Sequence, residues 1–175
     1  QWETDAGGFT NRNRWNAMDA AGTDGLATKG YYGAVYDGRY VYYVPYSDGT
    51  TNHARVLRYD TRKESMSGGS WEAYDAGNTS GLNTKGYIGG VFDGRYIYFV
   101  PHHDGTAYSG KVLRFDTQGE FKSAGSWAAY DAGSTGGLNT KGYWGGAFDG
   151  RYVYFTPFHD GSSYHGRVLR YDTQG

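Results

Sequence analysis

The chain alternates short runs of aromatic and β-branched residues with polar, glycine-rich stretches, and no stretch shows the 3.6-residue period of an amphipathic helix. The clearest pair of runs is residues 87–92 and 96–100, joined by Asp93-Gly94, a sequence typical of a tight β-hairpin turn. Residues 96–100 are apolar or aromatic on both faces, so we expect this strand to be covered on both sides. Residues 87–92 contain Gly89-Gly90, a pair tolerated in strands where another backbone comes close.

This hairpin belongs to a 56-residue unit that occurs three times. Trp15, Trp71 and Trp127 follow one another at that spacing, and residues 71–119 and 127–175 are identical at 36 of 49 positions. A fixed period of this size is typical of propellers, solenoids and other arrays. In the second unit, the pattern predicts four strands in one antiparallel meander, at residues 71–74, 87–92, 96–100 and 111–115.

We therefore predict an all-β protein, a β-propeller built of four-stranded antiparallel meander blades. The Trp strand forms the outer edge of each blade, and the strand with the Gly pair lies nearest the crowded axis. We divide the chain into an N-terminal remnant segment (residues 1–14) and three repeats (residues 15–70, 71–126 and 127–175). The alternative is a threefold β-trefoil or β-prism, which three four-stranded repeats also suit.

Three blades are too few for one ring, because propellers typically have about 4 to 8. The third unit ends after its third strand, whereas the strand expected at residues 15–18 is a spare outer strand. We expect a homodimer with six blades. In this strand-exchange closure, the strand at residues 15–18 completes the last blade of the partner chain.

The order of features within a unit resembles a kelch-type β-propeller blade. The features are a strand, an Asp-Gly turn, a strand ending in Tyr-x-Phe, a polar loop, Val-Leu-Arg-Phe-Asp-Thr at residues 112–117 and a later Trp. The resemblance covers all three units and implies a propeller with internal symmetry. Kelch repeats carry their Gly pair after the second strand, whereas Gly89-Gly90 lies one strand earlier, so we transfer no functional residue from that family.

Composition and charge narrow the classes of partner. The chain has 30 Gly and 19 Tyr, a composition typical of β-strands joined by tight turns. Its formal net charge of −1 and pI near 6.6 argue against nucleic acid or an anionic membrane as a partner. The absence of Cys excludes disulfides, thiolate metal sites and Cys nucleophiles. The chain starts at Gln1, which fits a processed secreted protein, a trimmed fragment or a tag-cleaved product. The compartment stays open, with an extracellular location preferred.

The meander sorts the loops into two faces, and the candidate binding residues lie on one of them. The face with the Asp-Gly turns carries Asp37 and Arg39 and their repeats, which we expect to form turns and surface ion pairs. The repeated Trp residues are expected in the core. The opposite long-loop face combines the polar linkers with the loops that follow each Pro. There we expect ligand binding by Lys29, Asp48, Asn83, Lys85, His103, Asp104, Tyr108, Asn139, Lys141, Trp144, His159, Asp160 and Tyr164.

Catalysis and metal binding are disfavoured by the same loops. His103-Asp104 and His159-Asp160 have the composition of metal ligands or an acid–base pair, but the first unit has Ser47 at the His position. The following Asp-Gly-Thr or Asp-Gly-Ser is ordinary turn sequence, and no nucleophile elbow, phosphate-binding Gly loop or His-Glu-x-x-His stretch is present. We expect no cofactor, no metal and no enzymatic activity.

One position varies while its neighbours do not, namely Tyr32, Ile88 and Trp144 within the Lys-Gly-Tyr-x-Gly segment. Differences in packing would explain this variation. The alternative is that the side chain at this position makes an aromatic contact with a ligand. Repeated pockets of aromatic and neutral polar groups suit multivalent binding. We therefore expect a lectin-like, carbohydrate-binding protein. The alternative is a protein-interaction or purely structural module, either engineered or excised from a longer propeller.

Overall fold

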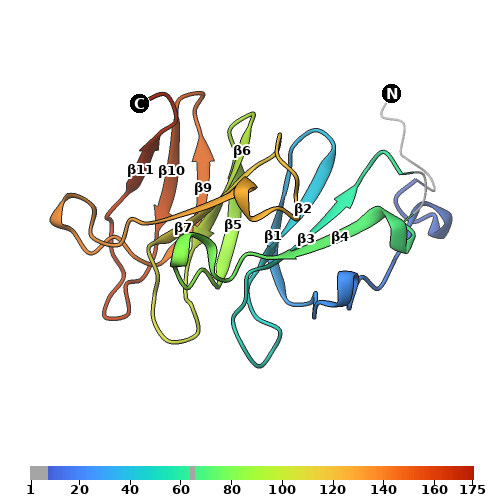
Figure 1. Cartoon of the computed structure of the whole chain (residues 1–175), viewed down its shortest axis with the longest axis horizontal. Coiled ribbons are helices and arrows are strands. Elements are labelled where there is room, and N and C mark those ends of the chain that lie inside the picture. Colours follow the sequence, from blue (N-terminus) through green and yellow to red (C-terminus); the bar gives the residue numbers. More distant parts are fainter. Residues whose placement is uncertain (1–7, 64–65) are drawn as a thin grey trace.

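The computed structural model describes residues 8–63 and 66–175, which form three antiparallel sheets (Figure 1). The first sheet consists of β1 (Tyr31–Tyr36), β2 (Tyr40–Pro45), β3 (Arg55–Asp60) and β4 (Trp71–Asp75). The second consists of β5 (Tyr87–Phe92), β6 (Tyr96–Pro101), β7 (Lys111–Asp116) and β8 (Trp127–Asp131). The third has β9 (Tyr143–Phe148), β10 (Tyr152–Pro157) and β11 (Leu169–Asp172).

Each sheet is an up-and-down meander with the order expected for a propeller blade. The strand orders are β1-β2-β3-β4, β5-β6-β7-β8 and β9-β10-β11, which confirms the Trp strand as the outer edge of the first two blades. The first strands of the blades adjoin, because β5 contacts both β1 and β9. The three sheets stand in an open row with the first and third sheets at opposite sides (Figure 1), so the chain forms propeller-like blades and not a closed trefoil or prism.

The remaining regular elements in the described residues are three-residue 3-10 turns. They are η1 (Arg12–Arg14), η2 (Thr23–Gly25), η3 (Gly68–Ser70), η4 (Thr79–Gly81), η5 (Ala124–Ser126) and η6 (Thr135–Gly137). Three of them, η1, η3 and η5, immediately precede the repeated Trp residues, and the other three lie in the polar linkers. In the described part of the chain, no helix is long and apolar enough to cross a membrane.

The Asp-Gly turns confirm the hairpins but change the predicted ion pair. Asp93 accepts hydrogen bonds from the backbone N–H groups of Arg95 (2.8 Å) and Tyr96 (2.6 Å) and from the hydroxyl of Tyr98 (2.9 Å). Arg95 therefore finds its partner elsewhere, in Asp116 at the end of β7, at 2.7 Å. The expected pairing of the turn Asp with the turn Arg is wrong, because the turn backbone and the Tyr hydroxyl already occupy that carboxylate.

The glycines of the first strands mark a crowded axis, as expected. A Cβ on Gly90 would lie 2.6 Å from Cγ2 of Val35 in the preceding blade, and a Cβ on Gly146 would lie 2.7 Å from Cγ2 of Val91. A Cβ on Gly89 would lie 3.8 Å from the Cα of the glycine at the same position in the next blade. Neighbouring blades thus approach through small residues on β1, β5 and β9.

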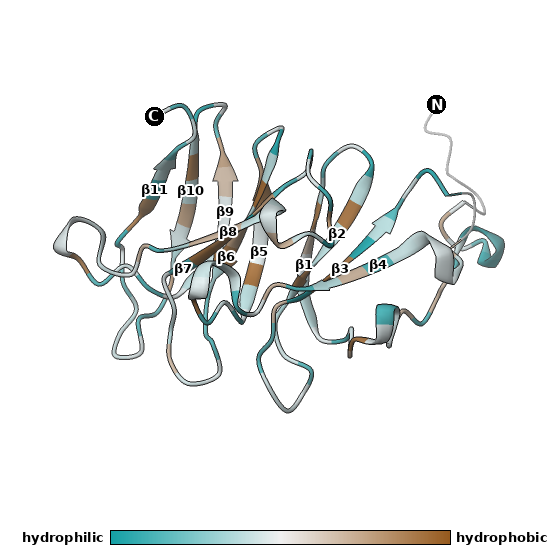
Figure 2. Ribbon diagram, in the orientation of Figure 1, coloured by the Kyte–Doolittle hydropathy of each residue, from teal (hydrophilic) through white to brown (hydrophobic). Residues whose placement is uncertain are grey.

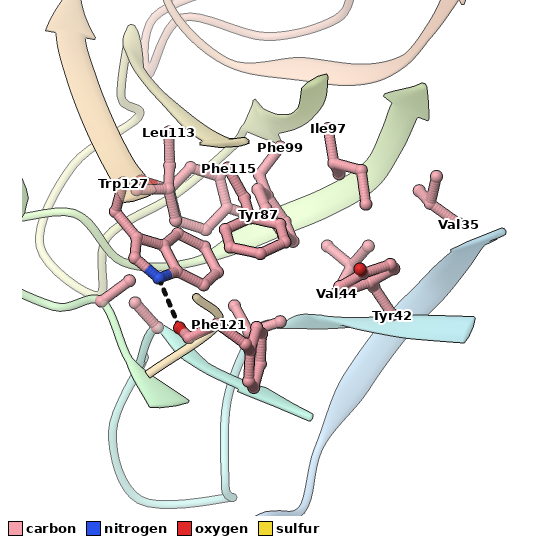
Figure 3. Close-up of a cluster of buried hydrophobic side chains, with 13 residues drawn as sticks. Val35, Tyr42, Val44, Tyr87, Ile97, Phe99, Leu113, Phe115, Phe121 and Trp127 are labelled. Carbon is pink, nitrogen blue, oxygen red and sulfur yellow. Dashed lines mark hydrogen bonds between the residues drawn. The ribbon is translucent and has the colours of Figure 1, made fainter. Parts of the chain in front are cut away.

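Apolar residues concentrate on the strands (Figure 2). Their buried side chains form core clusters that join residues of adjacent sheets. Residues 97–100 of β6 are all buried, which confirms that this strand is covered on both faces. Between the first and second blades, the core gathers around Tyr42, Phe99, Phe121 and Trp127, and the indole N–H of Trp127 donates to the carbonyl of Phe121 at 2.8 Å (Figure 3).

The N-terminal segment departs from two expectations. Trp71 and Trp127 are buried as predicted, but Trp15 is 62% exposed. Residues 15–18 also form no strand in this chain, because a strand requires a hydrogen-bonding neighbour and none lies beside them. Residues 1–7 of the predicted remnant segment lie outside the described residues, and the repeat boundaries stay a prediction.

Candidate functional site on the long-loop face

The long-loop face consists of the loops after β2, β6 and β10 together with the polar linkers that lead into β1, β5 and β9. Backbone hydrogen bonds tie each loop to its linker. The N–H groups of His102 (3.1 Å) and His103 (3.3 Å) both donate to the carbonyl of Gly86. Gly86 has a φ of +70°, and a Cβ there would lie 1.8 Å from the carbonyl oxygen of His103. The predicted grouping of loops and linkers on one face is confirmed.

The carboxylates of the three loops organise their own turns. In the second blade, Asp104 accepts from the N–H groups of Thr106 (2.8 Å) and Ala107 (2.9 Å) and from the Thr106 hydroxyl (2.6 Å), and its other oxygen lies 3.8 Å from the ammonium nitrogen of Lys111. Although burial opposes ionisation, these contacts together hold the pKa of Asp104 below its ordinary value. This carboxylate therefore stabilises the loop that carries it.

The same arrangement recurs in the other two blades. Asp48 pairs with Arg55 at 2.5 Å, and Asp160 pairs with Arg167. The pKa of Asp48 is lowered, chiefly by the hydrogen bond from the Thr50 hydroxyl, and that of Asp160 chiefly by the backbone N–H of Ser163. All three carboxylates are thus ionised and already hydrogen-bonded within their loops.

His103 and His159, which precede Asp104 and Asp160, are also hydrogen-bonded within their turns. Nδ1 of His103 accepts from the N–H of Gly105 at 3.1 Å, and Nδ1 of His159 accepts from the N–H of Gly161 at 3.0 Å. Within residues 8–63 and 66–175, no three His, Asp or Glu side chains converge as a metal site would require. The hydrogen-bonding pattern accounts for the His-Asp sequences as turn chemistry.

Aromatic rings gather on this face and form what we call the aromatic cluster: Tyr32, Tyr46, His102, Tyr108, Trp144 and Phe158. His102 lies in the middle, with ring centroids at 5.2 Å from both Tyr108 and Trp144, 5.6 Å from Phe158 and 6.0 Å from Tyr46. The cluster joins side chains of all three blades.

Two rings at the margins of the cluster present a face to solvent. Trp144 packs against Phe158 at 4.6 Å and is 47% exposed, and Tyr32 packs against Tyr46 at 5.1 Å and is 50% exposed. Ile88, which occupies the same position in the second blade, is buried. The variable position therefore carries an exposed ring in the outer two blades.

His102 is fixed by a hydrogen bond across the blade boundary. Its Nδ1 lies 2.9 Å from the carbonyl oxygen of Tyr143, so Nδ1 carries the proton and donates it. Burial lowers the pKa of His102, which outweighs the opposing effect of this bond. The ring is neutral at pH 7 and serves as a packing partner of the exposed rings.

Adjacent loops also contact one another directly. The side-chain amide of Asn52 donates to the carbonyl of His103 at 2.6 Å, and the ring of Tyr108 lies 5.0 Å from that of His159. Beside Asn52, a polar hollow of about 450 Å³ lies between the first two blades, lined by Arg55, Lys85 and other residues. The face is therefore continuous across the three blades.

The structure brings the thirteen predicted residues together only in part. Trp144, Tyr108, His103, His159 and Tyr164 lie in or beside the aromatic cluster. Lys85 lines the polar hollow, Asn139 donates to Asp160 at 3.2 Å, and Lys141 is half-buried. Lys29 and Asn83 lie exposed on the linkers. Which of them bind a ligand stays a prediction.

The prediction missed the centre of the cluster. Tyr46, His102 and Phe158 each directly follow the Pro that ends the second strand of the blade, and all three have ring side chains. Their shared position after Pro is the signal in the sequence that identifies them.

Comparison with known proteins adds no family. No model of a known protein family matches the chain, and a search of curated proteins finds no relative. The repeated four-stranded antiparallel sheet is thus the level at which the fold is assigned.

Proposed function

We propose that this protein is a multivalent, non-catalytic binding module of the lectin type that takes carbohydrate on its long-loop face. The observation that carries the proposal is the pair of half-exposed rings, Trp144 and Tyr32, each held by a second ring beneath it. A rigid aromatic face suits the C–H face of a sugar, because it supplies a large apolar contact at little cost in conformational entropy.

Polar groups beside the rings complete the requirement. The loops around Trp144 present hydroxyl, amide and imidazole groups, among them Tyr164, Asn139 and His159. Such hydrogen-bonding groups match sugar hydroxyls. Because the repeats present similar positions on one rigid scaffold, several weak sites act together through effective concentration. We further propose that the blades are of the kelch type, on the order of their strands and turns.

A glycan array followed by titration of any hit tests this function. Trp144→Ala and Tyr32→Ala should each weaken binding at least about tenfold, the effect of losing one well-packed aromatic contact. Tyr36→Ala is the matched control, since Tyr36 is a similarly exposed ring (54%) at the other end of β1.

Two results would count against the proposal. Unchanged affinity in Trp144→Ala with loss in Tyr36→Ala would place the site on the opposite face. An array without any bound glycan would favour the second candidate, a protein-interaction module, which an exposed apolar groove elsewhere on the molecule supports.

A further inference from the structure

The third blade has an uncovered edge and an apolar groove beside it. A groove of about 440 Å³ lies between the outer strands of the second and third blades. Its apolar lining continues the core between these blades, which includes Tyr98, Phe155 and Leu169. In the groove, Tyr130 is 71% exposed and Tyr171 is 44% exposed. The two Tyr rings thus expose a large apolar surface at an edge that no further strand in the described part of this chain covers.

The same groove occurs one repeat earlier, where it is filled. Each of these groove residues has a counterpart 56 residues earlier in the chain. The counterparts of Tyr98, Arg114, Tyr130, Leu169 and Tyr171 are, in that order, Tyr42, Arg58, Tyr74, Leu113 and Phe115. These residues enclose Phe121 and Trp127: Trp127 stacks on Tyr74 at 5.2 Å, Phe121 lies 5.5 Å from Phe115, and the Arg58 guanidinium lies 4.2 Å from the Phe121 ring. The filled interface therefore shows which side chains the open groove fits.

The N-terminal segment carries the matching pair of rings in the matching conformation. Phe9 and Trp15 stand six residues apart, as Phe121 and Trp127 do, with a 3-10 turn before each Trp. The indole N–H of Trp15 donates to the carbonyl of Phe9 at 2.7 Å, against 2.8 Å for the buried pair. Past the strand position, Asp19 accepts from the N–H of Ala21 at 2.9 Å, as Asp131 accepts from Gly133 at 3.0 Å.

This segment is formed but unpartnered in its own chain. Phe9 is 74% exposed and Trp15 62%, whereas Phe121 and Trp127 are 1% and 6% exposed. The segment that carries these exposed rings and the strand β11 beside the uncovered groove lie at opposite ends of one molecule, as the course of the chain in Figure 1 shows.

The linker after the segment fixes it far from its own groove. In η2, Asp24 accepts from the N–H of Ala73 in β4 at 2.8 Å and pairs with Lys122 at 2.7 Å. The next linker docks in the same way, with the Ser80 hydroxyl accepting from the N–H of Ala129 in β8 at 3.1 Å. The segment is therefore held at the first blade, whereas the groove lies at the third.

We propose that the groove is an interface for a second copy of this chain, whose residues 8–19 enter as the fourth strand of the third blade. Phe9 and Trp15 of the second copy occupy the places that Phe121 and Trp127 fill one blade earlier. The register of β7 with β8 predicts the pairs Arg167 with Asp19, Leu169 with Ala17, and Tyr171 with Trp15. Applied twice by a twofold axis, the exchange closes a ring of six blades.

Paired cysteines test the register directly, because the chain has no cysteine of its own. In the proposed register, Asn16 faces Arg170, as Ala128 faces Arg114. Cα atoms of directly opposed antiparallel residues lie about 4.5–5.5 Å apart, within the range that a disulfide bridges. The variant Asn16→Cys with Arg170→Cys should oxidise to a species of twice 19.3 kDa, and Asn16→Cys with Gln118→Cys should not.

Each other outcome overturns the proposal. A cross-link within one chain would mean that the segment folds back into its own groove. A ladder of higher oligomers would exclude closure by two copies, and cross-linking no greater than in the control would exclude this occupant.

A second variant separates the interface from folding. Trp15→Ala should raise the dimer dissociation constant at least about 30-fold, as expected for an aromatic hot spot, and leave the circular dichroism spectrum unchanged. Gln118→Ala, at an exposed residue of the second blade, is the control and should not change it. Equal dissociation constants for the two variants would contradict the proposal.

Discussion

Phe121→Ala probes the contact that joins the first two blades. Phe121 is buried, and its ring lies 5.5 to 6.1 Å from the rings of Phe115, Trp127 and Tyr42 (Figure 3). It also lies 6.3 Å from the ring of Tyr74. Its carbonyl accepts the Trp127 indole N–H, and alanine keeps that acceptor. The substitution therefore removes the ring contacts and leaves the backbone hydrogen bond in place.

The expected loss follows from the burial and the ring contacts of Phe121. Replacing a buried Phe by Ala lowers the free energy of unfolding by about 3–5 kcal/mol. The cation–π contact with Arg58 at 4.2 Å adds about 0.5–1 kcal/mol. We expect a loss of about 4 kcal/mol, a large part of the roughly 5–15 kcal/mol that stabilises a typical domain.

Urea denaturation followed by Trp fluorescence measures this loss. At a slope of about 2 kcal/mol per molar urea, the midpoint should fall by about 2 M with little change in slope. Phe9→Ala is the repeat-matched control, and its effect should vary with chain concentration, because Phe9 is buried only in the proposed pair. A loss below about 1 kcal/mol for Phe121→Ala would refute the packing between blades described above.

Two further substitutions, at Gly86 and His102, test the packing of the long-loop face. Gly86→Ala should prevent folding to a soluble protein, because its Cβ would collide with the His103 carbonyl. The control Gly94→Ala, also at positive φ but in open space, should lower the free energy of unfolding by only about 1 kcal/mol. Equal soluble yields and melting temperatures for the two variants would contradict the close approach at Gly86. Burial lowers the pKa of His102 in the folded chain, so the unfolded chain binds the proton more readily and stability should fall as the pH drops below about 6.5. His102→Phe should flatten the part of that pH dependence due to this ring in thermal melts between pH 5 and 7, and an unchanged profile would show that His102 does not contribute to it.

The blade architecture was readable from the sequence because its signals are local. The Asp-Gly turns fix the hairpins through hydrogen bonds between residues two and three positions apart, such as those from Arg95 and Tyr96 to Asp93. The Gly pair predicted that another segment approaches closely, and the structure shows that this neighbour includes Val35 of the preceding blade. Partners distant in sequence were harder to find, and Arg95 pairs with Asp116 across the blade, a contact that the turn pattern does not encode.

The candidate site could be predicted only in part from the sequence, because an Asp in a polar loop can either bind a ligand or stabilise the loop itself. Asp104 was expected to face a ligand, but its oxygens are occupied by its own loop, so a substitution there would disturb the loop as well as any ligand. Trp144 was selected from its variable position and its ring is exposed, yet its ring neighbours His102 and Phe158 were not among the predicted ligand-binding residues. Contacts between blades define the aromatic cluster, and such contacts follow only from the three-dimensional arrangement.

The mass of the protein in solution tests the proposed ring most directly. Size-exclusion chromatography with light scattering, run over a wide range of chain concentrations, should give twice 19.3 kDa, with a return to 19.3 kDa on Trp15→Ala. A wild-type chain that stays at 19.3 kDa at high concentration would contradict the exchange of residues 8–19 between two copies.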